Sequence, residues 1–355
     1  MAGPCYDAPD SEAGTYDVTS KEPRVRGVEP PHAVPGGRVS ILGEGFDPAR
    51  AHEHRVFFGD RRAQVTRVSR THISAIVPEG AMPEVQVGVA GSLSAPYRVS
   101  VATMLAEELQ PVANPAFDPD GSLYVTFSGS RGEKVPVSIF RVEPDGELNP
   151  LANEIVNPTG LAWGPDECLY VSSRQEGSVY RIPRNREAEM IADELGIATG
   201  IAFDREGILY VGDRRGTIFR IEPNGEPRTF CRLEPSVAAY HLAFDAEGNL
   251  FVTAPSLASV DPVYRVSREG EVDVFLSGFG RPQGIAFDGD GNLYVTEGLA
   301  GDSGLYRISP GGEVERVVTA PPLVGLAFDG KGGIALAGTS AVFQLELGVA
   351  GLPLL

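Results

Sequence analysis

Two residues in the C-terminal part of the chain carry side chains suited to acid–base chemistry, His241 and Glu297. His241 is the single histidine after residue 102, and an imidazole changes its charge near neutral pH. A lone histidine is most often a hydrogen-bonded packing residue, but it can also act as a general base or contact a ligand. Both interpretations stay open, and the pair is a candidate catalytic site only if the fold brings the two side chains together.

Further candidate binding residues flank short apolar segments that recur along the chain. The residues that come just before or at the start of these segments are Asn114, Thr159, Thr199, Tyr240, His241 and Gln283. The segments that follow contribute Arg174, Asp213, Arg214 and Arg215, in addition to Glu297. If the recurring strands converge on one axis, these side chains should line a ligand-binding mouth at one end of it.

Other patterns that could suggest metal chemistry have simpler explanations. Asp-x-x-Gly recurs at 118–121, 204–207, 245–248, 288–291 and 329–332, without the later bidentate Glu of a calcium loop. Asp and Gly at this spacing favour tight hairpin turns. His52 and His54 lie in a stretch expected to be exposed, and Cys5, Cys168 and Cys231 form no Cys-x-x-Cys pair. We therefore assign no metal site to these residues.

Composition and charge narrow the classes of partner. The chain has 355 residues and a formal net charge of −18, and an acidic surface repels nucleic acid and anionic lipid. No apolar run approaches the length of a membrane span. Residues 1–20 form an acidic tail without Lys, Arg or an apolar stretch, so we expect no secretory signal and a cytoplasmic protein.

An internal repeat predicts the fold of residues 102–355. The phrase apolar-Ala-Phe-Asp-x-x-Gly-x-Leu-Tyr-Val recurs six times at intervals of roughly 40 residues, for example as IAFDREGILYV from Ile201 and IAFDGDGNLYV from Ile285. Each unit contains a short apolar strand, a turn, an alternating strand, a third strand such as Ile218–Ile221 and a fourth such as Asp273–Leu276. Four strands in each unit of this length predict an all-β, six-bladed β-propeller.

The sixth repeat ends after its third strand, at Val342–Leu347. Thr103–Leu109 (TMLAEEL) resembles Glu189–Leu195 (EMIADEL), which is the expected fourth strand of the second blade. We therefore predict that the strand at about 103–109 joins the last blade and closes the ring, which removes two exposed sheet edges.

Residues 21–101 lack the repeat and read as about seven short strands separated by turns, which is typical of a small β-sandwich. The segment resembles the IPT/TIG family of immunoglobulin-like domains through Val39–Phe46 (VSILGEGF), Val56–Gly59 (VFFG) and Ile73–Pro78 (ISAIVP). The resemblance implies a binding or spacing module, not a catalyst.

The repeats resemble the SMP-30/gluconolactonase/LRE-like propellers and NHL-repeat propellers, above all at Pro158–Val171 and Pro282–Val295. The lactonase resemblance implies a divalent cation such as Ca²⁺ on the axis, held by acidic and Asn side chains. The positions that match those ligands are Asn114, Thr159, Thr199, Tyr240 and Gln283, and none is a carboxylate. His241 and Glu297 also invite comparison with propeller lyases of the virginiamycin-inactivating type.

The sequence thus favours a non-catalytic binding or scaffold protein that receives a small molecule, glycan or protein partner at the propeller mouth or rim. Two other functions stay open. One is a metal-dependent lactonase or a lyase acting at the same mouth, and the other is a structural subunit of a larger assembly. The oligomeric state is not determined by the sequence.

Overall fold

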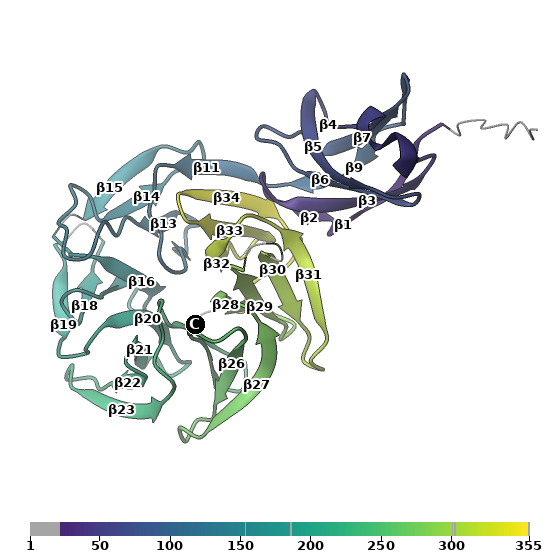
Figure 1. Cartoon of the computed structure of the whole chain (residues 1–355). Coiled ribbons are helices and arrows are strands. Elements are labelled where there is room, and N and C mark those ends of the chain that lie inside the picture. The colour runs from purple at the N-terminus through teal and green to yellow at the C-terminus, as the bar shows by residue number, and fades with distance from the viewer. Residues whose placement is uncertain (1–21, 153, 185–186, 300, 302, 354–355) are drawn as a thin grey trace, which may run out of the picture.

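The structure, a computed structural model, describes residues 22–353 except 153, 185–186, 300 and 302. The expected acidic tail, 1–20, lies outside the described residues. The described chain is all-β, as predicted, and its one helix is a short 3₁₀ segment at Pro48–Glu53. No helix in this part of the chain has the length and apolar character needed to cross a bilayer. Strands form an N-terminal sandwich and a propeller-like ring of sheets (Figure 1).

The N-terminal strands pair in one continuous path that folds around a single core. Its order is β1 (Arg24–Glu29), β3 (Arg38–Glu44), β6 (His72–Ile76), β5 (Arg61–Val68), β4 (Arg55–Phe58), β7 (Glu84–Val89) and β8 (Ser92–Leu93), with β9 (Tyr97–Arg98) also on β7. Buried and half-buried residues alternate along β7, which is expected for strands with one face on a core. Ile41 and Ile73 from one part of the path share that core with Phe58 and Val85 from the other, so the path forms an immunoglobulin-like sandwich.

The ring is built from antiparallel sheets, and within each repeat the chain runs from the innermost strand outward. Four of them follow one another: β12–β15 (Ala116–Phe117, Leu123–Thr126, Ile139–Val142, Leu148–Ala152); β16–β19 (Pro158–Trp163, Leu169–Ser173, Ser178–Ile182, Glu189–Ala192); β20–β23 (Ala198–Phe203, Leu209–Asp213, Thr217–Ile221, Pro227–Arg232); β24–β27 (His241–Phe244, Leu250–Thr253, Asp261–Val266, Val272–Phe279). All neighbouring strands within these sheets are antiparallel. The innermost strands stand around the centre of the ring (Figure 1).

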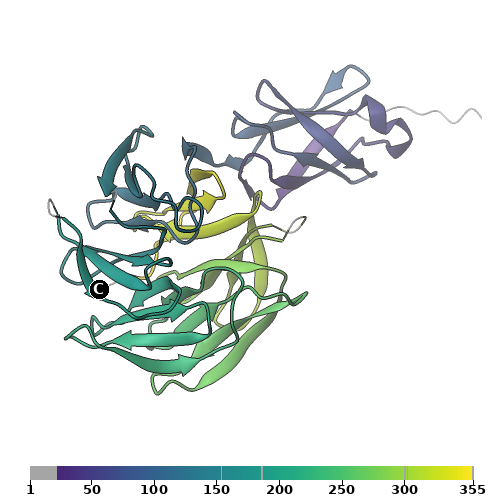
Figure 2. The same ribbon diagram turned by 60° about the vertical axis from the view of Figure 1, so that its left-hand side comes forward.

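The next sheet in the ring has six strands instead of four. Its inner part is β28 (Pro282–Phe287), β29 (Leu293–Glu297), β30 (Gly304–Ile308) and β31 (Val314–Thr319), and two strands from the N-terminal part, β2 (His32–Ala33) and β10 (Ser100–Val101), continue it. β2 pairs with β31 in parallel, with His32 opposite Val318, and β10 pairs with β2. The sequence placed 95–101 in the sandwich alone and did not anticipate this shared sheet, which joins the sandwich to the ring (Figure 2).

The last sheet contains strands from both ends of the repeat region. β32 (Leu323–Phe328), β33 (Gly333–Gly338) and β34 (Ala341–Glu346) are joined on the outside by β11 (Thr103–Glu107). β11 is antiparallel to β34, with Thr103 opposite Gln344 and Glu107 opposite Ala341. The Leu109 amide also donates to the Ser340 carbonyl at 3.0 Å.

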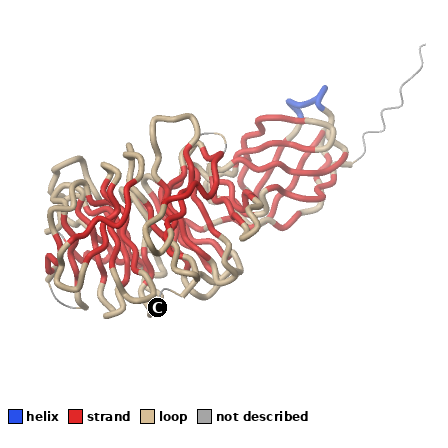
Figure 3. The backbone as a smooth tube through the Cα atoms, turned by 90° about the horizontal axis from the view of Figure 1, so that it is seen from below, coloured by secondary structure: helices blue, strands red, loops and turns tan. Residues whose placement is uncertain are grey.

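The Asp-x-x-Gly segments form hairpin turns, as predicted. In the turn between β28 and β29, Asp288 Oδ1 accepts the backbone N–H groups of Asp290 and Asn292 at 3.0 and 2.8 Å. Asp204 and Asp245 accept equivalent bonds in their own sheets. These carboxylates are buried in the turns that join the first and second strands of their sheets. Loops and turns lie at both ends of the ring of strands (Figure 3).

Candidate functional site

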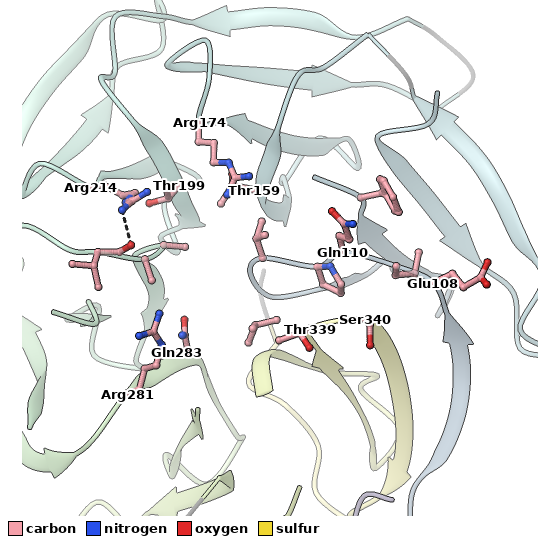
Figure 4. A pocket seen from close by; sticks show the side chains of 18 residues that line it. Glu108, Gln110, Thr159, Arg174, Thr199, Arg214, Arg281, Gln283, Thr339 and Ser340 are labelled. Atoms are coloured by element: carbon pink, nitrogen blue, oxygen red, sulfur yellow. Dashed lines mark hydrogen bonds between the residues drawn. The ribbon is translucent and has the colours of Figure 1, made fainter. Parts of the chain in front are cut away.

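A pocket of about 740 Å³ opens at the end of the ring where the loops after the second strands meet the segments that lead into the innermost strands. Four innermost strands contribute Thr159, Thr199, Gln283 and Val324. The surrounding loops contribute the rest of the lining, namely Glu108–Val112, Phe127, Arg174, Arg214, Val237–Ala239, Arg281, Thr339 and Ser340 (Figure 4). The sequence-predicted residues that the structure brings together here are Thr159, Thr199, Gln283, Arg174 and Arg214.

The inner part of the pocket is polar and buried. Thr159, Thr199 and Gln283 are each at least nine-tenths buried. The Thr159 hydroxyl donates to the Asn157 carbonyl at 3.2 Å, and the Thr199 hydroxyl donates to the Gly212 carbonyl at 3.0 Å. The Gln283 carboxamide shares one hydrogen bond with His241, and because a carboxamide has two donors and an acceptor oxygen, it is the inner group best able to contact a ligand as well.

Arg174 and Arg214 occupy equivalent places, directly after the second strands β17 and β21. Their backbone N–H groups donate to the carbonyls of Asn157 and Ile197, both at 3.2 Å. Arg174 Nη2 donates to the Gly129 carbonyl at 3.3 Å, and Arg214 donates to the carbonyls of Ser236 and Val237. Backbone oxygens thus orient both guanidinium groups and leave several of their five N–H donors unused.

Arg281 is the third arginine of the pocket, and it precedes β28 by one residue. Its carbonyl accepts the Gly298 N–H at 3.0 Å, which ties it to the loop after β29. The side chain is exposed, and Figure 4 shows it beside Gln283 on the lower side of the pocket. The sequence analysis selected Gln283 in this segment and missed Arg281. The side-chain direction of a residue that precedes a strand depends on the path of the loop before it, and the sequence pattern does not give that path.

The remaining wall is largely apolar. Val112, Phe127 and Val324 line it, together with Pro111 and Leu109. Glu108 is the one carboxylate among the lining residues, and Figure 4 shows it on the far side of the pocket from the three arginines. The segment Glu108–Val112 follows β11 in the connection to β12, so its place at the mouth depends on where β11 pairs. No local pattern in the sequence indicated this placement.

The two carboxylates proposed for the mouth, Glu297 and Asp213, hold loops in place. Glu297 is 3% exposed and accepts the backbone N–H groups of Gly280, Arg281 and Leu299 at 2.9, 2.9 and 2.6 Å. Burial raises the pKa of Glu297, and these backbone bonds oppose the rise. Asp213 accepts the N–H groups of Ile197 and Arg215 at 2.8 and 3.1 Å. Neither carboxylate lines the pocket.

His241 shares a hydrogen bond with Gln283 and lies outside the pocket lining. It is 2% exposed, and burial lowers its pKa to about 4, against a smaller opposing effect of a hydrogen bond with Gln283. Its Nε2 is buried without a hydrogen-bond partner among the described residues. In the preceding sheet the position equivalent to His241 is Gly200. A side chain does not fit there, because a Cβ would come within 2.2 Å of the Tyr240 carbonyl oxygen. The imidazole is therefore neutral near pH 7 and does not reach the pocket.

Three other predicted site residues point elsewhere. The Asn114 carboxamide donates to the Ile285 carbonyl at 3.0 Å and accepts the Leu326 N–H at 3.2 Å, so it bridges β28 and β32. Tyr240 is fully buried in a core cluster, and its hydroxyl donates to the Glu234 carbonyl. Arg215 is exposed and does not line the pocket.

These contacts also test the axial metal site that the lactonase resemblance implies. Of its five ligand positions, the Asn114 carboxamide is hydrogen-bonded to two backbone groups, and Tyr240 lies in the core. The hydroxyl groups of Thr159 and Thr199 donate to backbone carbonyls. No cluster of His, Cys, Asp or Glu suited to a metal ion occurs among residues that the structure describes. The positions do not fit a divalent cation, which prefers several carboxylate oxygens.

Comparison with known proteins supports the fold of both parts of the chain. Residues 23–102 match the IPT/TIG domain family, so the N-terminal sandwich is an IPT/TIG domain. Comparison with curated proteins gives no match.

Three solved structures resemble the chain in fold. A structural-genomics target assigned provisionally to the gluconolactonases has a TM-score of 0.58 and 19% identity over 71% of this chain and 94% of its own. An auxiliary nutrient binding protein from Bacteroides ovatus has a TM-score of 0.54 and 15% identity over 92% and 98%. A streptogramin B lyase has a TM-score of 0.50 and 14% identity over 75% and 87%. At these identities the likeness concerns the fold alone.

Proposed function

We propose that the protein is a non-catalytic binding protein that takes up a small organic molecule in the axial pocket. The observation that carries this proposal is the pocket itself, about 740 Å³ in volume with a buried polar floor and an apolar wall. Concave sites of this size and mixed lining are typical of ligand pockets.

The positions of the acid–base groups favour binding over catalysis. A lactone hydrolase or a lyase at this mouth needs a base or acid that reaches the substrate. His241 is buried outside the pocket lining, and the Glu297 carboxylate accepts three backbone N–H groups. The nutrient binding protein from Bacteroides ovatus, alike over 92% of this chain, adds support for a binding role.

We also propose that the ring is a six-bladed propeller. Five of its sheets have four strands, and the sixth blade would be β28–β31, the inner part of the six-stranded sheet. β11 would then close the ring as the outermost strand of the blade formed with β32–β34. The repeat count in the sequence and the pairing of Thr103 with Gln344 support this interpretation.

The binding role can be tested by filling the pocket. Thr339 is an exposed lining residue, so Thr339→Trp should obstruct the mouth with little effect on folding. Ala95→Trp, on the exposed surface of the IPT/TIG domain, is the matched control. Calorimetric titration with a panel of small acids, sugars and amines should detect binding that Thr339→Trp abolishes and Ala95→Trp retains. Binding that survives Thr339→Trp would contradict the proposal.

A further inference from the structure

The charge inside the pocket is opposite to the charge of the molecule. The chain carries a net charge of −18, yet the pocket places three guanidinium groups, Arg174, Arg214 and Arg281, on one side of its lining. They come from three different sheets of the ring and face the same space (Figure 4).

None of these three arginines forms an ion pair within the described parts of the chain. Elsewhere arginines pair with acids across neighbouring strands, as Arg307 does with Glu315 at 2.6 Å. Asp213 and Glu297, in the loops that carry Arg214 and Arg281, accept backbone N–H groups instead. The one lining carboxylate, Glu108, lies on the other side of the pocket and pairs with none of them, so the three guanidinium groups outnumber the acids of the lining.

The arrangement has an electrostatic cost. Burial lowers the pKa of Arg174, and the charges of Arg214 and Arg131 lower it further, so these cations repel one another. Like charges gathered in a pocket without a stabilising partner are typical of functional sites, where a ligand supplies the missing charge. A planar guanidinium with free N–H donors is also the protein group best matched to a carboxylate or phosphate.

We infer that the ligand is an organic anion whose carboxylate or phosphate group lies among Arg174, Arg214 and Arg281. This inference rests on the proposed binding function and names its ligand class. The buried Gln283 carboxamide would contact a polar part of the same molecule, and Val112, Phe127 and Val324 would contact its apolar part.

The test compares analogues of similar size and shape that differ in charge. Phenylacetate, phenylacetamide and phenethylamine form one series, and galacturonate, galactose and galactosamine form another. Binding to the full chain is measured by calorimetry at low salt. We expect the anion of at least one series to bind ten times more tightly than its neutral analogue or better, and to weaken as salt screens the charges.

Substitutions of the three arginines test whether the preference for anions arises in the pocket. Arg174→Gln, Arg214→Gln and Arg281→Gln should each weaken anion binding about tenfold or more, because each removes charge-assisted hydrogen bonds. Arg205→Gln makes the same charge change in an exposed turn at the opposite end of β21 and should leave the affinity unchanged. Thermal unfolding of every variant separates lost binding from lost folding.

The outcomes distinguish the inference from the proposed function. Neutral or cationic analogues that bind as tightly as the anions, and are blocked by Thr339→Trp, would overturn the anion assignment and leave the binding function standing. Equal weakening of anion binding by Arg205→Gln would also overturn it. Binding of no compound in either series would overturn both.

Discussion

Polar side chains around the mouth divide into those that face the pocket and those that hold the scaffold. Glu297 and Asp213 have residue types suited to catalysis, but their oxygens accept backbone N–H groups of neighbouring loops. Buried carboxylates bonded in this way keep loops in one conformation. The same loops carry Arg281 and Arg214, so the scaffold residues determine where the pocket arginines stand.

Glu297→Gln should destabilise the protein without a direct effect on ligand binding. The amide keeps the shape but turns its NH₂ group toward N–H donors, which leaves buried groups unsatisfied at a cost of about 1–3 kcal/mol. Urea unfolding of the variant against Glu247→Gln, an exposed control, measures this loss. Unchanged stability together with abolished turnover of a lactone would instead restore Glu297 as a catalytic residue.

His241 should make folding sensitive to acid. Burial holds its pKa at about 4 in the folded chain, against 6.5 for an unperturbed histidine, so the unfolded chain takes up the proton first. The stability that comes from keeping His241 neutral is complete above pH 6.5 and is lost as the pH falls toward 4. The loss amounts to roughly 2–3 kcal/mol between neutral pH and the lower limit.

His241→Asn removes the titrating group and should reduce this acid sensitivity. Unfolding free energies of both proteins, measured at neutral pH and near pH 4, give the comparison. Parallel decreases in the two proteins would show that His241 does not contribute.

At the scale of elements, β11 and β2 each join the ring from a distant part of the sequence. β11 extends the sheet that ends at β34, and β2 extends the sheet that ends at β31. Both cover edges that would otherwise offer unpaired backbone groups. β2 also brings the IPT/TIG domain against the ring, where the Val34 N–H donates to the Thr319 carbonyl at 2.8 Å.

A disulfide across β11 and β34 tests the proposed closure. Thr103 and Gln344 face each other in the antiparallel register, so Thr103→Cys with Gln344→Cys should cross-link on oxidation. Because the bond would close nearly the whole ring, we expect a gain of about 2–4 kcal/mol in the free energy of unfolding. Either single cysteine variant is the control, and failure to cross-link in the folded protein would contradict the pairing.

The junction between domains depends on a close approach of backbone at Gly37. A Cβ there would lie 2.6 Å from the Thr319 carbonyl oxygen, so Gly37→Ala should shift the junction and cost about 1–3 kcal/mol. Gly88→Ala in β7 is a matched control, because its Cβ would meet ordinary contacts at 3.5 Å. Proteolysis between the domains should accelerate for Gly37→Ala alone, and equal rates would contradict the role given to Gly37.

The elements could be predicted from sequence where their signals are local. The Asp-x-x-Gly turns and alternating strands recur within each unit, so the all-β fold and the ring of repeats follow from them. β2 has two residues and no alternation, so its pairing with β31 left no local signal. Arg281 and the Glu108–Val112 segment reach the pocket through loop paths, and Asn114 turns between β28 and β32; these placements come from tertiary packing.

At the scale of the whole molecule, an acidic protein surrounds a pocket with three arginines on one side. The overall negative charge discourages nucleic acid and anionic surfaces, whereas the concave pocket concentrates positive charge where a small anion can enter. We therefore expect an anionic ligand in the pocket, and we do not expect polyanionic partners on the outer surface.

The account can be tested most directly by determining the structure of the protein with the tightest-binding member of the two analogue series. We predict density in the axial pocket, with a carboxylate within hydrogen-bond distance of at least two of Arg174, Arg214 and Arg281. An empty pocket with the compound bound elsewhere, or a compound whose charged group points away from the arginines, would contradict the account.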